Sequence, residues 1–585
     1  MLRRTFLRAA PAAGGALALA GLSPAAAAAA RRAILPPVAD PLYDTPIARA
    51  TAVPRFVNAL PRPPRVDLTD GGARTLRLAE TSQDLLGGGL GLPSTVWGFG
   101  LDAGPNGEAA LPASSPGPTI VARAGRTLSL DWRNDLPYRH LFPMDEDAHW
   151  AFTGSEYTVE QHGVPSVVHV HGAHTDSASD GHPDAWYSPG GAAGPLHGGT
   201  RCTYHNSQEA APLWYHDHTH GITGLNIYAG LLGFYLLRDE HELGLIASRR
   251  LPAEPYELEL AIQDRTFRPD GLLAFPSPTP HDHEETEPPT FAGQVILVNG
   301  KAWPYLDVEP RQYRLRLLNA SNARFYRLSS GGGWPFPVTA IGGDGGFLDE
   351  PHRLEEGLLL APGERADVIA DFRDAGGRTF DLTNDAPLPF PGGAPVAAPV
   401  DAVLQFRVSL PYDRSAPEPV LPASLRRRPY RILTRPARTR RLQLLETVDE
   451  HGRTQMMLGT AEEGGMLWGD PVTETPRLHT TEVWELYNTT EETHSVHLHL
   501  VQFQVLDEAP FTADRDPERG ALSSIVTGER LPLSPSERGP KDTVRIRPSH
   551  VVRVKARFDK AGDYVWHCHL LPHEDAGMMR RFTVS

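Results

Sequence analysis

The chain has 585 residues, of which 40% are hydrophobic and 22% charged, and this composition argues against a disordered or fibrous protein. The formal net charge of -15, without a long run of Lys or Arg, argues against a nucleic-acid partner, because phosphate binding requires a basic surface. The 56 prolines and 55 glycines are spread along a chain long enough for several domains. This spread is typical of short strands joined by turns and favours an all-β fold.

Residues 1–32 predict an export signal. Arg3 and Arg4 precede a stretch rich in Ala, Gly and Leu, and an alanine tract follows. The segment resembles a twin-arginine signal with an A-x-A type cleavage region. A membrane anchor is less favoured, because Pro11 and Pro24 interrupt the short apolar run, and no other segment is suited to stable membrane insertion. We therefore expect the twin-arginine export machinery as a partner, and a periplasmic, cell-wall-associated or extracellular location.

The body of the chain repeats a strand pattern. Three segments with apolar residues two apart end in asparagine, at Asn134, Asn319 and Asn488. This alternation places the apolar side chains on one face of a strand. In addition, residues 361–376 can be overlaid on residues 547–562 without a gap. Such strands with Gly/Pro turns predict three consecutive Greek-key β-sandwich domains.

The predicted domains cover residues 33–245, 246–415 and 416–585, and they differ in their chemistry. Continuing the overlay aligns residues 381–383 (DLT) with residues 567–569 (HCH). The first copy has HDH after a corresponding aromatic pair. The middle domain therefore has no metal ligand, and we interpret it as a structural or substrate-facing spacer.

Four His-x-His units stand out among the 25 histidines: His169/His171, His216/His218, His497/His499 and His567/His569. Residues i and i+2 of a strand project from the same face, so each unit offers two imidazoles in one direction, which suits adjacent metal ions. Another such pair, His281 and His283, lies in an acidic, proline-flanked loop. That pair is predicted to be a solvated surface turn.

A second set of candidate ligands lies beside the last two units: His494, Cys568, His573 and Met578. Two imidazoles, a thiolate and a thioether are the ligands of a blue-copper electron-transfer site, because soft sulfur stabilises Cu(I). Cys568 stands between His567 and His569, so in a strand its side chain points away from theirs, toward a different metal. The other cysteine, Cys202, is predicted to be a buried free thiol.

These motifs resemble the four ligand motifs of multicopper oxidases. The resemblance is carried by 168–172 (VHVHG), 214–218 (WYHDH), 494–499 (HSVHLH) and 566–569 (WHCH) with His573 and Met578, and also by 298–301 (VNGK) and 470–476 (DPVTETP). It extends over nearly the whole mature chain. In appearance the chain is most similar to spore-coat laccases, bilirubin oxidases and phenoxazinone synthase.

The resemblance implies cupredoxin-like domains and four copper ions per chain. It implies a type 1 copper held by His494, Cys568, His573 and Met578, a type 2 copper held by His169 and His497, and a type 3 pair held by His171, His216, His218, His499, His567 and His569. Two acidic residues, Asp180 and Glu574, match positions near the trinuclear site. They are candidates either for a proton relay or for orienting the histidine ligands.

The resemblance also implies an enzyme, a laccase-type copper-dependent oxidoreductase. Such an enzyme couples the one-electron oxidation of phenols, aminophenols, aromatic amines or bilirubin-like compounds to the four-electron reduction of dioxygen to water. Met456, Met457 and Met466 form the only loose methionine group outside the ligand region, and we favour core packing over a Cu(I) path for them. The alternatives are a cuprous or ferrous ion oxidase in copper tolerance, and a non-enzymatic copper-storage protein.

Overall fold

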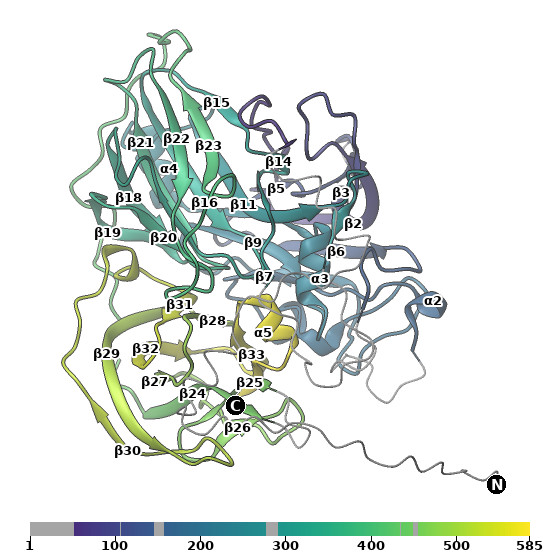
Figure 1. Cartoon of the computed structure of the whole chain (residues 1–585), viewed down its shortest axis with the longest axis vertical. Coiled ribbons are helices and arrows are strands. Elements are labelled where there is room, and N and C mark those ends of the chain that lie inside the picture. Colours follow the sequence, from purple (N-terminus) through teal and green to yellow (C-terminus); the bar gives the residue numbers. More distant parts are fainter. Residues whose placement is uncertain (1–51, 106, 145–156, 276–290, 433, 449–453) are drawn as a thin grey trace, which may run out of the picture. The chain divides into compact units, whose positions relative to one another are not determined.

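The computed structural model describes residues 52–105, 107–144, 157–275, 291–432, 434–448 and 454–585 (Figure 1). These residues belong to one unit, Thr45–Ser585. The predicted export signal and the predicted turn at His281 and His283 lie outside the described residues. Export therefore remains a prediction.

The first stretch of the described chain forms two five-stranded sheets. Its strands are β1 (Arg65–Asp67), β2 (Gly72–Gln83), β3 (Ser94–Leu101), β4 (Leu111–Ser114), β5 (Thr119–Arg123), β6 (Leu128–Asp135), β7 (Val168–His171), β8 (Arg201–Tyr204), β9 (Ala211–Asp217) and β10 (Leu232–Arg238). The sheet orders are β1-β5-β10-β9-β7 and β4-β3-β2-β6-β8. The rings of Trp132 on β6 and Tyr215 on β9 lie 5.4 Å apart, so side chains of the two sheets pack together in one core.

The second stretch forms an eight-stranded and a five-stranded sheet. Its strands are β11 (Glu257–Phe267), β12 (Leu273–Ala274), β13 (Val295–Val298), β14 (Lys301–Ala302), β15 (Tyr305–Asp307), β16 (Gln312–Asn319), β17 (Tyr326–Ser329), β18 (Val338–Gly343), β19 (Gly346–Arg353), β20 (Leu358–Leu360), β21 (Arg365–Asp371), β22 (Thr379–Asn384) and β23 (Ala402–Arg407). The larger sheet has the order β14-β13-β11-β16-β21-β18-β19, with β12 on β11, and the smaller has the order β15-β23-β22-β17-β20.

The third stretch forms a seven-stranded and a four-stranded sheet. Its strands are β24 (Arg438–Val448), β25 (Thr454–Thr460), β26 (Gly464–Met466), β27 (Thr480–Asn488), β28 (His494–Leu498), β29 (Phe503–Arg515), β30 (Leu522–Thr527), β31 (Thr543–Ile546), β32 (His550–Phe558), β33 (Gly562–Cys568) and β34 (Met579–Val584). The orders are β26-β25-β24-β27-β32-β29-β30 and β31-β28-β33-β34. Trp484 of the first sheet and Trp566 of the second meet edge to face, 5.8 Å apart.

Helices are few and short in the described residues: α2 (Val159–His162), α3 (Thr223–Ala229), α4 (Glu240–Ala247) and α5 (Leu571–Asp575), with the 3-10 turns η2 (Ser177–Ser179), η3 (Pro183–Ala185) and η4 (Pro535–Glu537). None of the helices in the described ranges has the length and apolar character needed to cross a membrane. The prediction of an all-β fold with paired sheets is confirmed. No strand crosses residue 245 or 415, but these positions remain predictions as domain limits.

The three asparagines of the sequence repeat occupy the same structural role. Each is buried within or at the end of a strand, namely β6, β16 or β27, that pairs in parallel with an earlier strand. In each, Nδ2 donates to two backbone carbonyls and Oδ1 accepts the backbone N–H two residues later. The amide therefore satisfies backbone groups that the sheet ladder leaves without a partner.

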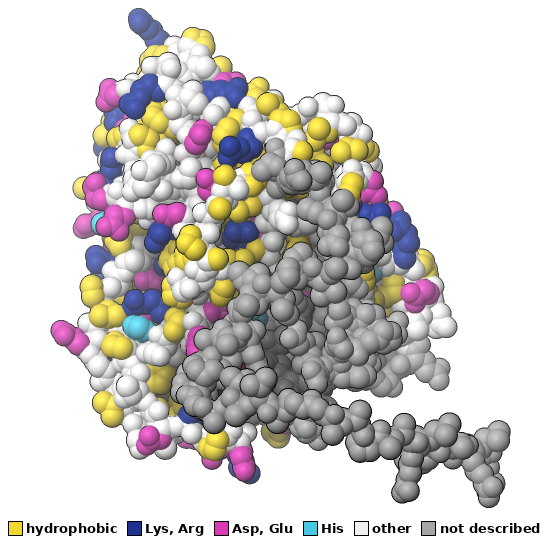
Figure 2. Space-filling model, in the orientation of Figure 1, with side chains coloured by type: hydrophobic (Ala, Val, Ile, Leu, Met, Phe, Trp, Pro, Cys, Tyr) yellow, Lys and Arg dark blue, Asp and Glu magenta, His cyan; other side chains and the backbone are white. Residues whose placement is uncertain are grey.

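Charged side chains of both signs are interspersed over the face shown in Figure 2. On that face, dark-blue Lys and Arg side chains lie among magenta Asp and Glu side chains. This mixed pattern accompanies the negative net charge of the chain.

Replacing Asn319 by alanine tests the role of the repeated asparagine away from the histidine units. The substitution leaves the buried carbonyls of Arg324 and Leu360 without their donor. We expect a loss of about 2–5 kcal/mol of unfolding free energy, since each unsatisfied buried group costs about 1–3 kcal/mol. Calorimetric unfolding measures the loss, with Thr379→Ala at an exposed strand position as the control. A change in Asn319→Ala no larger than that in the control would contradict the assignment.

Candidate metal centre

Two pairs of antiparallel strands bring the four His-x-His units together. In the first stretch, β7 pairs with β9 and places His169 opposite His216. In the third stretch, β28 pairs with β33 and places His497 opposite His567, as the labelled strands of Figure 1 show. The rings of His169 and His497 lie 5.6 Å apart, so the two pairs of strands face each other at this point.

The second histidine of three units lies beyond the end of its strand. His218, His499 and His569 follow the last residues of β9, β28 and β33. Only His169 and His171 lie within a single strand. The rule that residues i and i+2 share a face of a strand therefore holds for this unit alone. Beyond a strand end the backbone direction is not fixed by the sheet ladder, so the second ring can turn toward a different group.

The imidazoles gather in three groups whose nitrogens lie within 4.8 Å of one another: His169, His497 and His499; His171, His216 and His569; and His218, His499 and His567. Each His-x-His unit contributes to more than one group. This is the arrangement expected of units that serve adjacent metal ions. Every ring in the three groups is buried.

The inner nitrogens of these rings fit metal ions. Within the described residues, His169 Nε2, His171 Nδ1, His216 Nε2 and His497 Nε2 are buried without a hydrogen-bond partner. His567 Nε2 lies 3.2 Å from both His218 Nε2 and His499 Nε2. A metal–imidazole bond is about 2 Å long, so two ligands of one ion lie about 3 Å apart.

The outer nitrogens of several rings are anchored, which fixes the orientation of those rings. Nδ1 of His216 donates to the backbone carbonyl of Asp217, at 2.7 Å. Nδ1 of His497 donates to the carbonyl of Asp542, also at 2.7 Å. Such outer contacts select the tautomer and direct the other nitrogen inward.

The two predicted acidic residues lie on the outer side of the same rings. Nδ1 of His499 donates to Asp180 Oδ2 at 2.7 Å, and Nδ1 of His169 donates to the Asp180 carbonyl. Glu574 Oε2 lies 2.8 Å from His567 Nδ1. Burial raises the pKa of the Asp180 carboxyl well above its ordinary value. Both contacts suit residues that orient histidines, while a proton relay remains a prediction.

A separate buried group contains Cys568. Cys568 Sγ lies 3.5 Å from His494 Nδ1 and 4.0 Å from His573 Nδ1, and the two nitrogens are 3.3 Å apart. Met578 is buried in the same hydrophobic cluster, and its carbonyl accepts the Cys568 N–H. Cys568 therefore faces a different group from that of His567, as strand alternation predicts.

Two side chains contact the outer nitrogens of this second group. Thr490 Oγ1 lies 2.7 Å from His494 Nε2, and Glu492 Oε1 lies 3.3 Å from His573 Nε2. Burial raises the pKa of the Cys568 thiol, so a free thiolate would be unfavourable at this place. A bound cation would reverse that preference, because coordination deprotonates a thiol.

Sequence reasoning missed residues that complete the imidazole site. Asp542 Oδ1 and Thr543 Oγ1 lie 3.1 and 2.9 Å from His171 Nε2, and Arg365 is bound to Asp542. The sequence contained one signal for Arg365: the ungapped overlay aligns this charged residue with Val551. No motif marks Asp542 or Thr543.

Other histidines, the methionine group and Cys202 lie outside the ligand groups of the described residues. His174 binds Asp559 at 2.7 Å and His220 binds Asp184 at 3.2 Å. Met456 packs in a hydrophobic cluster. Cys202 is a free cysteine of intermediate exposure rather than a fully buried one. Cys202 lies on β8, which pairs with β6 at the edge of a sheet.

Comparisons with known proteins agree with this geometry. Residues 435–585 match the family model for multicopper oxidases. The chain is 41% identical to the laccase of Bacillus subtilis over 500 residues, which covers 84% of this chain and 91% of that protein. It is 35% identical to multicopper oxidase LPR1 of Arabidopsis thaliana over 85% of this chain and 88% of that protein. The crystal structure of the McoA multicopper oxidase of Aquifex aeolicus superposes with a TM-score of 0.68 at 27% identity, covering 90% of this chain and 99% of that one.

The chain belongs to the multicopper oxidase family. It is a copper-dependent oxidoreductase that uses dioxygen, and its β-sandwich stretches correspond to the cupredoxin-like domains of that family. The buried, inward-facing ring nitrogens and the thiol with two imidazoles form a donor set suited to copper.

The stability of the copper-free protein should depend strongly on pH. Burial lowers the pKa of His169 to about 3, and lowers the pKa of His171 and His216 well below the ordinary value. In the unfolded chain these groups titrate near pH 6.5. Because the folded pKa is depressed, their contribution to stability is complete above about pH 6.5 and is lost as the pH falls toward 3.

Thermal unfolding of the copper-free and copper-loaded protein between pH 8 and pH 4 measures this dependence. We expect both forms to lose stability as the pH falls below 6.5, because the unfolded chain takes up protons there while these folded imidazoles stay neutral. The copper-loaded form should remain more stable by a nearly constant amount, since copper binds the folded chain. A copper-free stability that does not change between pH 6.5 and pH 4 would contradict the burial of neutral imidazoles.

Proposed function

We propose that this chain is a laccase-type oxidase that takes single electrons from organic donors and reduces dioxygen to water. The observation that carries the proposal is the position of Cys568. It contacts His494 and His573 in one group, while its neighbours His567 and His569 belong to the imidazole groups. The backbone of these three residues forms a short covalent path between the two sites.

We assign four copper ions to these groups. In this assignment, type 1 copper is held by His494, Cys568, His573 and Met578, type 2 copper by His169 and His497, and the type 3 pair by His171, His216 and His569 for one ion and by His218, His499 and His567 for the other. Bound copper would supply one-electron transfer at the first group and reduction of dioxygen at the others.

In this proposal, particular side chains bind the donor and hold the protons. His573 is 5% exposed, whereas His494 is fully buried, so the donor is oxidised at the His573 edge. Glu492, beside this edge, offers a carboxylate to the hydroxyl or amine of a phenol or aminophenol. In this proposal, Asp180 and Glu574 either hold protons next to His499 and His567 or only orient these rings, and their contacts with the two rings support both roles.

The middle stretch of the chain borders the donor side of the site. The backbone N–H of Thr493, next to His494, donates to the Phe390 carbonyl at 2.8 Å. Phe390 stacks on Phe325 with ring centroids 4.8 Å apart. This contact supports a substrate-facing role for the middle stretch.

A metal-ion donor is the second candidate. Met457 and Met466 line a cavity of about 650 Å³ together with Glu463 and Asp470. Thioethers and carboxylates are ligands for cuprous and ferrous ions respectively. We rank this candidate second because the chain has only seven methionines and no methionine-rich insert.

Oxygen uptake with a donor panel tests the proposed function. Copper-loaded protein should consume dioxygen with 2,6-dimethoxyphenol or an o-aminophenol and should release water rather than hydrogen peroxide. Efficient turnover of Cu(I) or Fe(II) with inert phenols would favour the metal-ion oxidase. Copper binding without any oxygen uptake would favour a copper-storage protein.

Replacing Cys568 by serine should separate the two sites. The serine hydroxyl is a hard, protonated ligand that is unsuited to Cu(I), so blue absorption and donor oxidation should be abolished. Copper should remain in the imidazole groups, which lack sulfur ligands. The measurements are copper content per chain, visible absorption and oxygen uptake.

Cys202→Ser is the matched control for this substitution. It should retain colour and activity, since Cys202 lies in none of the ligand groups of the described residues. Blue colour that persists in Cys568→Ser, or that disappears in Cys202→Ser, would overturn the ligand assignment.

A further inference from the structure

His171 differs from the other anchored imidazoles in the nitrogen that it presents. His169, His216, His497 and His499 anchor Nδ1 on outer acceptors. His171 instead anchors Nε2, on Asp542 Oδ1 at 3.1 Å and beside Thr543 Oγ1 at 2.9 Å. Its Nδ1 has no hydrogen-bond partner in the described residues. Asp542 therefore determines which nitrogen of His171 faces inward.

Asp542 serves a second ring at the same time. Its backbone carbonyl accepts the hydrogen bond of His497 Nδ1 at 2.7 Å. The rings of His171 and His497 stack with centroids 3.6 Å apart. A displacement of Asp542 would consequently move or release one ring from the first stretch of the chain and one from the third.

Arg365, on β21 of the middle stretch, holds Asp542 through both carboxylate oxygens. Nη1 donates to Oδ1 at 2.8 Å and Nη2 donates to Oδ2. The remaining donors of the guanidinium are also occupied, by the carbonyls of Pro212, Asp344 and Gly363 at 3.1, 3.1 and 2.8 Å. All five N–H donors are therefore used, which fixes the plane of the guanidinium and the rotamer of Asp542.

Two glycines leave room for this ion pair and for a neighbouring ligand ring. A Cβ atom on Gly172, the residue after His171, would overlap Asp542 Oδ2 and lie 3.0 Å from Arg365 Nη2. A Cβ atom on Gly363 would lie 2.9 Å from the ring of His569. Both glycines have positive φ, at 86° and 82°. The first and middle stretches thus approach the ligand rings where only glycine fits.

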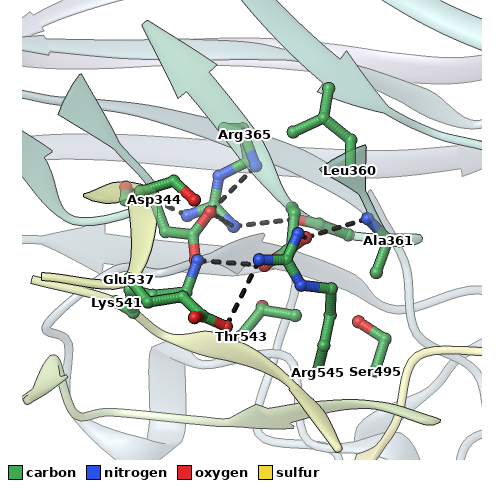
Figure 3. Close-up of polar contacts among 12 residues, drawn as sticks. Asp344, Leu360, Ala361, Arg365, Ser495, Glu537, Lys541, Thr543 and Arg545 are labelled. Atoms are coloured by element: carbon green, nitrogen blue, oxygen red, sulfur yellow. Dashed lines mark hydrogen bonds and ion pairs between the residues drawn. The ribbon is translucent and has the colours of Figure 1, made fainter. Parts of the chain in front are cut away.

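A buried charge network surrounds Arg365 (Figure 3). Lys541 Nζ lies 2.9 Å from Asp344 and 3.0 Å from Glu364, and Arg545 pairs with Glu364 and Glu537. The network thus contains three cations and four carboxylates: Arg365, Lys541 and Arg545, with Asp344, Glu364, Glu537 and Asp542. Of the carboxylates, Asp542 is the one directed at His171. Its negative charge is placed where copper ions would supply the compensating charge.

We propose that Arg365 is a positioning residue for the trinuclear copper site. It acts through Asp542 to hold His171 with Nδ1 inward and His497 in its stacked position. The proposal rests on the proposed function, because it takes these rings as copper ligands. In this proposal the middle stretch of the chain supplies no ligand, but it fixes the orientation of two rings of the oxygen-reducing site.

Arg365→Lys tests the proposal, since lysine keeps the charge but cannot bind both carboxylate oxygens in the planar geometry of arginine. The variant should keep its blue absorption and its KM for a phenol. It should show an altered type 2 copper signal by electron paramagnetic resonance, a higher KM for dioxygen, and about 10- to 100-fold weaker retention of the trinuclear copper against a chelator.

The matched control is Arg314→Lys. Arg314 is an equally buried arginine of the middle stretch that binds both oxygens of Asp367, and it contacts none of the ligand rings. It should leave the paramagnetic signal and the KM for dioxygen unchanged. A wild-type signal in Arg365→Lys, or the same change in both variants, would overturn the positioning role.

Asp542→Asn provides a second variant if Arg365→Lys does not fold. An amide nitrogen turned toward His171 Nε2 would offer a donor in place of an acceptor, so the same selective change is expected. Unchanged signals in this variant would reject the proposal. Failure of the proposed function itself is distinguishable, because the wild-type protein would then take up no dioxygen with phenols or aminophenols, whatever the variants show.

Discussion

Eight imidazole rings are buried together, shielded from solvent, where the first and third stretches of the chain meet. Burial opposes the protonation of an imidazole, and it lowers the pKa of His171 and His497. A buried ring must also satisfy its outer nitrogen, because a lost hydrogen bond there costs free energy. The carbonyls of Asp217 and Asp542 and the carboxylate of Asp180 meet this demand. The same contacts direct the inner nitrogens toward the interior of the ligand groups.

The ends of the strands distribute the rings among the metal ions. A continuous strand would hold both rings of a His-x-His unit on one face. His218, His499 and His569 lie beyond the ends of their strands, and each joins a group with rings from another unit. Cys568, the last residue of β33, faces the opposite side. One strand end therefore supplies both candidate sites and connects them through the backbone.

The middle stretch of the chain contacts both sites although it contributes no ligand. Its Pro362 carbonyl accepts the hydroxyl of Ser495 at 2.8 Å, next to His494. The Phe390 carbonyl accepts the backbone N–H of Thr493, also next to His494. The stretch interpreted from the sequence as a structural or substrate-facing spacer thus lies against the candidate ligands. Glu364 of this stretch is buried with ion pairs to Lys541 and Arg545 of the third stretch.

The sequence by itself determined the all-β class, the asparagine repeat and the identity of the candidate ligands, because these depend on local alternation and on residue type. Cys568 between two histidines already predicts that thiol and imidazoles face different metals. Only the tertiary structure decided how the six type 3 candidates divide into two groups of three, which nitrogen of His171 faces inward, and that Asp542 and Arg365 take part. These features depend on contacts between residues that are 177 or 371 positions apart, and no local pattern records such contacts.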